Sequence, residues 1–444
     1  MFSRKSLYLA LATSTLAGTV SAQGVESDDE IFALEEIIVT ARLREESLQE
    51  TPLSITAISG DSLEERNITS VRSLMDQTPG VYFTNQGGPG LGNVSMRGLT
   101  QGSLIGDEAN VASFVDGFYW AGRIAFDGFL DGLERVEVVR GPQSALYGRN
   151  SFSGAINYIT KKPDMDEMHG SAKVSYGEEG RQSYSGSFTS PLVDGKAAIR
   201  IDASHMETGS TWKNSTTGER MNDAESDNLR VQIAWNPSER ISMNYAYTYV
   251  DRETSEQPLF AIPGSELDSG YKFDFISYSY RNHKSQYPTP RPDTDLDFHT
   301  SDLTGSSYGV DRHTFHFDYE ADTFLTSILI ASTEENVRTI TDSSYGAGGN
   351  IMLATIGDFF DPYSAPVPTP IDLDGNFIPD LFPTIGGQPI QDREDMSAEI
   401  RFQSTGTGPL TWAFGGFMST LEYTDRLETG YDMSVGVRND IPEL

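Results

Sequence analysis

Alternation of apolar and polar residues constrains the fold of this chain more than any other sequence feature. Every second residue between 229 and 235 is apolar, and after a turn at 236–239 the same period continues from 241 to 249. A period of two is that of a β-strand, whose successive side chains point to opposite faces. Each strand therefore has one apolar and one polar face, as in half-buried antiparallel sheets.

We expect about nine such strands, joined alternately by short turns and by long polar excursions, of which 253–305 and 343–393 are the longest. Short connections at one end and long ones at the other are typical of transmembrane β-barrels, with Tyr and Trp forming girdles at the strand ends. A soluble β-sandwich with one solvated face is the alternative. The expected strands lie near 169–177, 181–191, 196–206, 226–236, 240–252, 310–320, 324–340, 395–404 and 410–423.

Residues 1–22 have the features of a secretory signal peptide. Arg4 and Lys5 precede an apolar run at 7–18, and small residues at 20–22 precede Gln23. We therefore expect cleavage before Gln23 and export of the remaining chain, although an amphipathic helix retained in the mature protein is the alternative. The chain has no cysteine, and an exported chain without cysteine fits a bacterial envelope.

Residues 48–163 are predicted to form a small α+β domain. Asp61, with Glu64 three residues later, is typical of a capping box that begins a helix. A second helix is expected at 70–77, ended by the Pro79-Gly80 pair. Strand-like segments are expected at 53–58, 94–97, 112–115, 135–139 and 155–160.

Several short motifs follow one another in this domain. They are Met-Arg-Gly at 96–98, Val-Asp-Gly at 115–117, and a run at 133–142 that continues at 145–148 and 154–157. Their order and spacing resemble the plug domain of the TonB-dependent outer-membrane receptors. The earlier segment resembles a TonB box, with the residues Glu36, Ile37, Ile38, Val39, Thr40 and Ala41.

The resemblance implies an α+β plug domain inside a transmembrane antiparallel β-barrel of 22 strands. Residues 1–22 would be the signal peptide, 23–47 a flexible N-terminus with the TonB box, 48–163 the plug and 164–444 the barrel strands. An apolar box between flexible flanks can add as a strand to the sheet edge of a partner. The implied partner is TonB, with its inner-membrane energising complex, and the implied location is the lipid of the bacterial outer membrane.

The resemblance also implies active import of a scarce ligand that binds external loops and plug apices. A ferric siderophore, which is an iron chelate, is the commonest cargo of the family. Import of another bulky solute, such as a glycan or cobalamin, is an alternative, because the aromatic-rich segment 260–287 could stack on a catecholate or on a sugar. A degenerate fragment that does not transport is a further alternative. Arg97 and Arg140 would face barrel carboxylates and hold the plug, but the partner glutamates of the family cannot be assigned here.

The chain departs from the family in length. About nine strands follow residue 165, whereas closing a barrel of about 22 strands at the same spacing needs roughly 680 residues. The chain also ends without the terminal aromatic strand of the family. Open edges are not tolerated in lipid, so we expect the barrel to be incomplete and this chain alone not to transport.

Other functions are disfavoured by composition and motifs. A net charge of -33 disfavours a nucleic acid as partner, and the absence of cysteine removes thiol chemistry. His313 and His316 would lie on opposite faces of a strand, and the acidic segment 372–375 lacks the later glutamate of a calcium loop. The glycines between 87 and 92 lack the phosphate-loop pattern, and no nucleophile elbow is present. We therefore expect no enzyme activity, no catalytic residue, no cofactor and no metal.

Overall fold

The computed structural model describes residues 38–39, 46–47, 53–85, 92–99, 110–120, 130, 132–148, 150–210, 212–213, 220–255, 305–342, 384–387, 390–406, 410–426 and 429–431. The expected signal peptide, the glycines at 87–92, the aromatic-rich segment 260–287 and the acidic segment 372–375 lie outside these residues. Within them, no helix is both long enough and apolar enough to cross a membrane.

The N-terminal domain is built on a five-stranded sheet with the order β3-β8-β9-β6-β7. Strand β6 is parallel to β9, and the other neighbours are antiparallel. Val136, Val138 and Val139 of β8 and Ile156 of β9 are fully buried, which matches the β-branched composition of these central strands. The strands are β3 (Ile55–Ser59), β6 (Val111–Val115), β7 (Phe118–Trp120), β8 (Leu133–Arg140) and β9 (Gly154–Thr160).

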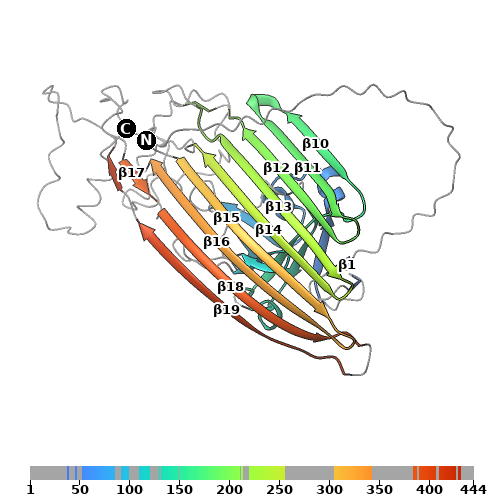
Figure 1. Ribbon diagram of the computed structural model, residues 1–444. Helices are drawn as coiled ribbons and strands as arrows, with labels where there is room; N and C mark the ends of the chain where they lie inside the picture. Colours follow the sequence, from blue (N-terminus) through green and yellow to red (C-terminus); the bar gives the residue numbers. More distant parts are fainter. Residues whose placement is uncertain are drawn as a thin grey trace, which may run out of the picture. The chain divides into compact units, whose positions relative to one another are not determined.

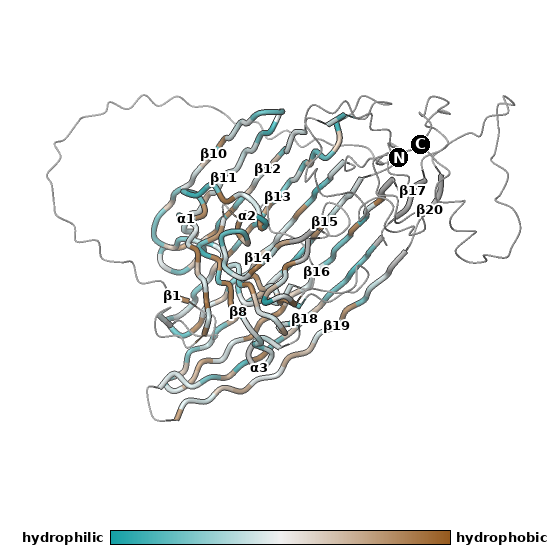
Figure 2. The backbone as a smooth tube through the Cα atoms, turned by 180° about the vertical axis from the view of Figure 1, so that it is seen from behind, coloured by the Kyte–Doolittle hydropathy of each residue, from teal (hydrophilic) through white to brown (hydrophobic). Residues whose placement is uncertain are grey.

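Three short helices and a hairpin complete this domain (Figure 2). The helix expected at 70–77 is confirmed as α2 (Val71–Asp76), capped by Ser70 in a capping box with Ser73. The expected role of Asp61 as a cap is wrong, because α1 (Gly60–Glu65) begins after Ser59, whose hydroxyl accepts from Ser62 N–H. The other elements are α3 (Ser144–Tyr147) and the hairpin of β4 (Val81–Asn85) with β5 (Gly92–Met96).

The second part of the chain forms an eleven-stranded antiparallel sheet, which we call the wall. Figure 1 shows its long strands side by side in chain order. All nine expected long strands are confirmed, and β17 (Thr384–Gly387) and β20 (Thr429–Tyr431) add two short ones. The long strands are β10 (His169–Tyr176), β11 (Gln182–Val193), β12 (Ala197–Thr208), β13 (Ala224–Ser238), β14 (Ile241–Thr254), β15 (Gly305–Glu320), β16 (Phe324–Asp342), β18 (Ile390–Ser404) and β19 (Ala413–Arg426).

The wall is polar on its covered face and apolar on its exposed face. On β13 the buried side chains are Ser226, Asn228, Arg230 and Gln232, whereas Ile233 is 39% and Trp235 49% exposed. Figure 2 shows the same alternation of hydropathy along the strands. A soluble sandwich buries its apolar face, so this reversed pattern excludes the alternative and is that of a sheet whose outer face meets lipid.

The N-terminal domain packs on the inner face of the wall. Trp120 and Val115 of the domain share one hydrophobic cluster with Tyr308 and Val310 of β15 and Val337 of β16. A smaller cluster joins Phe118 to two residues of β16. The apolar contacts with the wall therefore include both strands of the β6–β7 hairpin, at one edge of the domain's sheet.

The reversed pattern predicts that Ile233→Lys destabilises the wall in lipid by about 2–4 kcal/mol, because it places a charge in the apolar band. Glu225→Lys is the matched control, since it lies on the same face of β13 near the strand end, where the cost falls to about 0–1 kcal/mol. Urea titration of the protein folded in lipid vesicles measures both. Equal effects of the two substitutions would contradict the assignment of this face.

Candidate functional site

The tip of the β6–β7 hairpin is a two-residue turn that presents a carboxylate to the wall. Asp116 and Gly117 have φ angles of 51° and 84°, and Val115 pairs with Phe118 across the turn. Two positive φ angles in a two-residue loop are those of a type I′ turn, for which Asp-Gly is a favoured sequence. The Val-Asp-Gly motif therefore fixes where the Asp116 side chain points.

Asp116 joins the domain to the wall. One carboxylate oxygen accepts from the backbone N–H of Thr160 at 2.8 Å, and the other accepts from the Thr160 hydroxyl at 2.8 Å and from Arg230 Nη2 at 2.7 Å. Arg230, on β13, is buried and also donates to Thr248 Oγ1 on β14 at 2.7 Å. A buried guanidinium needs a counter-charge and hydrogen-bond acceptors, and Asp116 supplies the charge.

Arg312 on β15 holds the second strand of the same hairpin. Its Nη2 donates to the carbonyl of Tyr119 at 2.9 Å, and its guanidinium carbon lies 4.5 Å from the centre of the Trp120 ring. Arg312 Nη1 donates to Thr333 Oγ1 on β16 at 3.2 Å. A cation over an indole face within about 6 Å is an attractive arrangement. Two wall arginines thus hold one domain hairpin.

A third polar contact extends this interface to the end of β9. The amide nitrogen of Gln232 donates to Thr160 Oγ1 at 3.3 Å and to the carbonyl of Lys161 at 3.2 Å. Arg230, Gln232 and Arg312 all lie on the inner face of the wall, and their partners belong to three different strands or strand ends of the domain. We call this set of contacts the clamp.

A buried polar network lies behind the hairpin within the domain. Asn157 Nδ2 donates to the Tyr147 hydroxyl oxygen at 3.0 Å, and the buried Glu137 carboxylate accepts from Arg135 Nε at 2.9 Å. Burial raises the pKa of Tyr147 well above the ordinary tyrosine value. The raised pKa favours the protonated, neutral phenol.

The two arginines singled out from the sequence make contacts inside the domain. Arg140 donates to the carbonyl of Pro79 at 3.0 Å. Arg97 has a φ of 55° and lies against Gly141, where an added Cβ would be 3.0 Å from Arg97 Nη1. No described contact joins either guanidinium to a wall carboxylate, and their role in holding the domain stays a prediction. The clamp instead uses cations of the wall and acceptors of the domain.

Part of the expected TonB box is paired within the chain. Ile38–Val39 forms β1 and pairs antiparallel with β2 (Glu46–Ser47), with Val39 opposite Glu46. Val39 is only 1% exposed. Glu36, Ile37, Thr40 and Ala41 lie outside the described residues.

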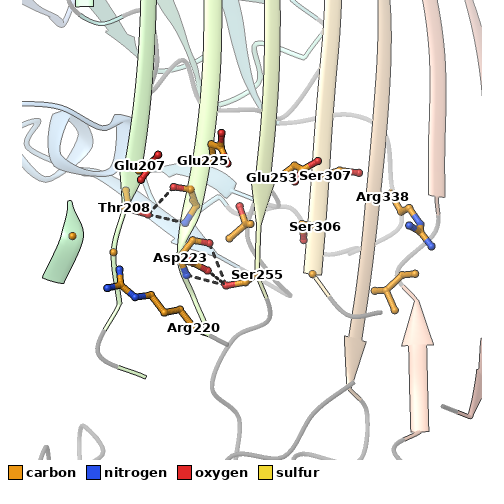
Figure 3. Close-up of a pocket in the computed structure, with 16 residues that line it drawn as sticks. Glu207, Thr208, Arg220, Asp223, Glu225, Glu253, Ser255, Ser306, Ser307 and Arg338 are labelled. Carbon is orange, nitrogen blue, oxygen red and sulfur yellow. Dashed lines mark hydrogen bonds between the residues drawn. The ribbon is translucent and has the colours of Figure 1, made fainter. Parts of the chain in front are cut away.

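A polar cavity of about 650 Å³ lies at the end of the wall strands that is next to the long excursions (Figure 3). We call this end of the wall the rim. Its lining comes from the ends of β12–β16 next to the long excursions, and it carries both carboxylates and guanidinium groups, from Glu207, Asp223, Glu225, Glu253, Arg220 and Arg338. Hydroxyls tie the rim together, since Thr208 Oγ1 accepts from Ala224 N–H at 2.9 Å and Ser255 Oγ from Asp223 N–H at 3.0 Å. The rim is therefore hydrophilic and closely hydrogen-bonded.

His205, Glu225 and Asp227 bring one possible ligand atom each within 4.8 Å of one another. Sequence reasoning did not indicate this group, because the residues lie on two strands. The His205 ring nitrogens are within hydrogen-bond distance of carboxylates, at 2.8 Å from Asp227 and 3.3 Å from Glu207. Both ring nitrogens of His205 thus already have a protein carboxylate as a hydrogen-bond partner.

Comparison with known proteins identifies the N-terminal domain. Residues 47–155 match the TonB-dependent Receptor Plug Domain family. This domain is a TonB-dependent receptor plug. The chain is 34% identical to the vitamin B12 transporter BtuB of Vibrio vulnificus over 173 residues, which are 37% of this chain and 26% of the relative. It is 34% identical to the ferrioxamine B receptor of Salmonella typhimurium over 160 residues, which are 34% of this chain and 22% of the relative.

The wall has the fold of a receptor barrel. The ferric yersiniabactin uptake receptor FyuA from Yersinia pestis superimposes with a TM-score of 0.62 at 17% identity, covering 86% of this chain and 50% of that receptor. The siderophore receptor PiuA from Acinetobacter baumannii gives a TM-score of 0.59 at 13% identity. The chain therefore spans about half of these receptors, and its fold is a plug followed by part of a transmembrane antiparallel barrel.

The relatives are receptors and transporters rather than enzymes. They include an iron-regulated outer membrane virulence protein of Vibrio cholerae, which is 26% identical over 294 residues, and a pesticin receptor of Yersinia pestis, which is 26% identical over 234 residues.

The clamp predicts the effect of removing its carboxylate. Asp116→Ala leaves the buried Arg230 without its counter-charge, so we expect the plug to lose about 3 kcal/mol of stability against release from the wall. Asp61→Ala is the control, because Asp61 is exposed on α1 and its loss should cost less than about 0.5 kcal/mol. Proteolysis of the plug during a urea titration of the full-length receptor measures both, and identical midpoints would refute the role given to Asp116.

Proposed function

We propose that the chain is part of a TonB-dependent outer-membrane receptor that actively imports a scarce ligand. The observation that carries this proposal is the clamp, which holds a plug domain on the polar inner face of a barrel wall. The hydrogen bonds and ion pair of the clamp can be exchanged for hydrogen bonds to water when the plug is released. That property suits a domain that must yield to an energised partner.

A ferric siderophore is the proposed cargo. The relation to the ferrioxamine B receptor supports this choice. Cobalamin is the second candidate, because the vitamin B12 transporter is related at the same identity. A glycan has no such support among these relatives.

TonB is the proposed partner of residues 36–41. A short apolar strand can add to the edge of another protein's sheet through its backbone. The pairing of Ile38 and Val39 with Glu46 and Ser47 shows that this backbone takes up strand geometry. The same groups that pair within the chain would then pair with TonB. Arg97 and Arg140 are further proposed to meet barrel carboxylates when the whole barrel surrounds the plug.

The outer membrane is the proposed location, reached after removal of residues 1–22. The exposed apolar face of the wall supports insertion in lipid, and the small residues at 20–22 support cleavage. The form recovered from outer membranes should therefore begin at Gln23. N-terminal sequencing tests this, and an intact Met1 or a start well inside the plug would contradict it.

Uptake by cells separates the two cargoes. A full-length receptor should import either ferrioxamine B carrying radioactive iron or radiolabelled cyanocobalamin, and only in cells that have TonB. Import of the iron chelate together with iron-repressed expression would support the first choice, and import of cyanocobalamin alone would support the second. Equal accumulation with and without TonB would refute the proposed function.

Energy coupling through the box predicts a specific defect. Val39→Pro removes the backbone N–H and fixes φ, so uptake should fall at least tenfold while ligand binding at the cell surface is unchanged. Val39→Ala keeps the N–H and should be much milder. Uptake assays at one surface-expression level compare the two variants. Loss of binding in Val39→Pro would instead make this segment part of the plug's own fold.

A further inference from the structure

One imidazole and three carboxylates come together on the outer face of the wall, on the neighbouring strands β12 and β13. They belong to His205, Glu207, Glu225 and Asp227. The register places His205 directly opposite Asp227 and Glu207 directly opposite Glu225, and Figure 3 shows the two glutamates on their strands. The even-numbered residues 226–232 of β13 are buried on the inner face, so the odd-numbered ones point outward. We call these four side chains the histidine patch.

The histidine patch lies at the border of the apolar outer face, next to the rim. On β13 the outward positions 229–235 are apolar, and 227 and 225 are the next outward positions toward the rim. On β12 the outward positions 199–203 are likewise apolar, and 205 and 207 follow. The hydrocarbon core of a bilayer is flanked by a polar headgroup layer. Water and dissolved cations therefore reach the patch.

Three of these side chains have the spacing of a set of metal ligands. One ligand atom each from His205, Glu225 and Asp227 lies within 4.8 Å of the other two, and His205 Nδ1 is 2.8 Å from Asp227 Oδ1. Bonds of about 2.0–2.2 Å from Zn²⁺ to nitrogen and oxygen put the ligand atoms of a tetrahedral site roughly 3.4 Å apart. Both carboxylate residues are exposed, so their side chains can rotate to close the set around one cation.

Glu207 has the position of a residue that orients the imidazole. His205 Nε2 lies 3.3 Å from the Glu207 carboxylate. A histidine that binds a metal through one ring nitrogen usually donates its other N–H to a carboxylate or carbonyl, which fixes the tautomer. With the proton on Nε2 and donated to Glu207, Nδ1 carries the free lone pair on the side of Asp227. Three protein ligands then leave a fourth position for water.

The register also concentrates negative charge at the patch. Glu225 lies directly opposite Glu207 on β12 and Glu253 on β14. Asp227 likewise lies opposite Asp251 on β14. Like charges directly opposite one another destabilise a sheet. A divalent cation bound by Glu225 and Asp227 would offset this repulsion where the two strands leave the apolar band.

We propose that His205, Glu225 and Asp227 bind a divalent transition-metal cation of the Zn²⁺ type, with Glu207 orienting the imidazole. An imidazole nitrogen beside carboxylates suits such a cation, whereas Ca²⁺ and Mg²⁺ prefer ligand sets made of oxygen alone. The ligands come from two strands, so the cation joins β12 to β13 at the rim and stabilises the folded wall. This structural role is independent of the proposed import function.

Calorimetric titration with Zn²⁺ tests the site. The protein carries no histidine tag and is folded in vesicles of phosphatidylcholine, whose headgroups have no net charge. The parent protein is compared with His205→Gln, Asp227→Asn and Glu207→Gln. The matched control is His313→Gln, because His313 is also exposed on a wall strand and its ring bonds to the Tyr245 hydroxyl at 2.8 Å. Urea titration without metal establishes that each variant is folded.

We expect the parent protein to bind one Zn²⁺, with at least tenfold weaker binding in His205→Gln and Asp227→Asn. Loss of the orienting group in Glu207→Gln should weaken binding about tenfold, and His313→Gln should stay within twofold of the parent. Zn²⁺ should raise the urea midpoint of the parent and of His313→Gln, but not that of His205→Gln, because only a bound cation stabilises the folded state.

Three results would overturn the site. They are an absence of Zn²⁺ binding to the folded parent protein, equal affinities of His205→Gln and His313→Gln, and displacement of Zn²⁺ by an equal concentration of Ca²⁺. The last result would make the patch an unselective acidic surface. None of them touches the proposed import function, which is measured by uptake.

Discussion

The ion pair between Asp116 of the plug and Arg230 of the wall is the contact on which this structure depends. A sheet whose outer face meets lipid keeps most of its polar side chains on the inner face, so a domain inside it meets arginines and amides beside a few apolar side chains such as Tyr308 and Val310. Buried charges are tolerated only when they are paired and hydrogen-bonded. Asp116 is both paired and hydrogen-bonded, since its carboxylate accepts hydrogen bonds from Thr160 within the plug and from Arg230 on the wall.

In the topology of the plug, the segment proposed to bind TonB and the hairpin held by the wall lie at opposite edges of the sheet. Residues 36–41, the proposed TonB box, precede β3, which is one edge of the five-stranded sheet, and β7 at the other edge is held by Arg312. Force on residues 36–41 would therefore reach the clamp contact at the end of β9 through β8, and the contacts of the β6–β7 hairpin through β9 and β6 as well. The hydrophobic cluster shared by Trp120 and the wall adds an apolar contact beside the polar ones, so the clamped edge is expected to yield last.

Local patterns in the sequence predicted the wall well. Period-2 alternation located all nine long strands, because side chains must alternate between lipid and lumen at every step of a strand. The helix at 70–77 was also predicted, since Ser70 and the Pro79-Gly80 pair mark its two ends. The cap of α1 was missed because Asp61 with Glu64 fits the capping-box pattern, whereas Ser59, which caps the helix, is followed three residues later by Ser62 rather than by Glu or Gln.

The clamp could not be predicted in the same way. Asp116 and Arg230 are 114 residues apart, and no local pattern relates them. The Val-Asp-Gly motif contributed to the resemblance to plug domains but did not indicate the partner of its carboxylate. One signal was present, because Arg230 shares the inner face of β13 with Asn228 and Gln232 and is therefore a cation that needs an acceptor. Naming that acceptor requires the register of the wall and the orientation of the plug, which come from the three-dimensional structure.

A double-mutant cycle on Asp116 and Arg230 tests the central claim most directly. The full-length receptor is compared with Asp116→Ala, Arg230→Ala and the double variant, and the free energy of plug release is measured for each in urea. If the two side chains hold the plug through their ion pair, the double variant should lose less than the sum of the single losses, with a coupling of about 1–3 kcal/mol. Additive losses, with a coupling near zero, would contradict the account.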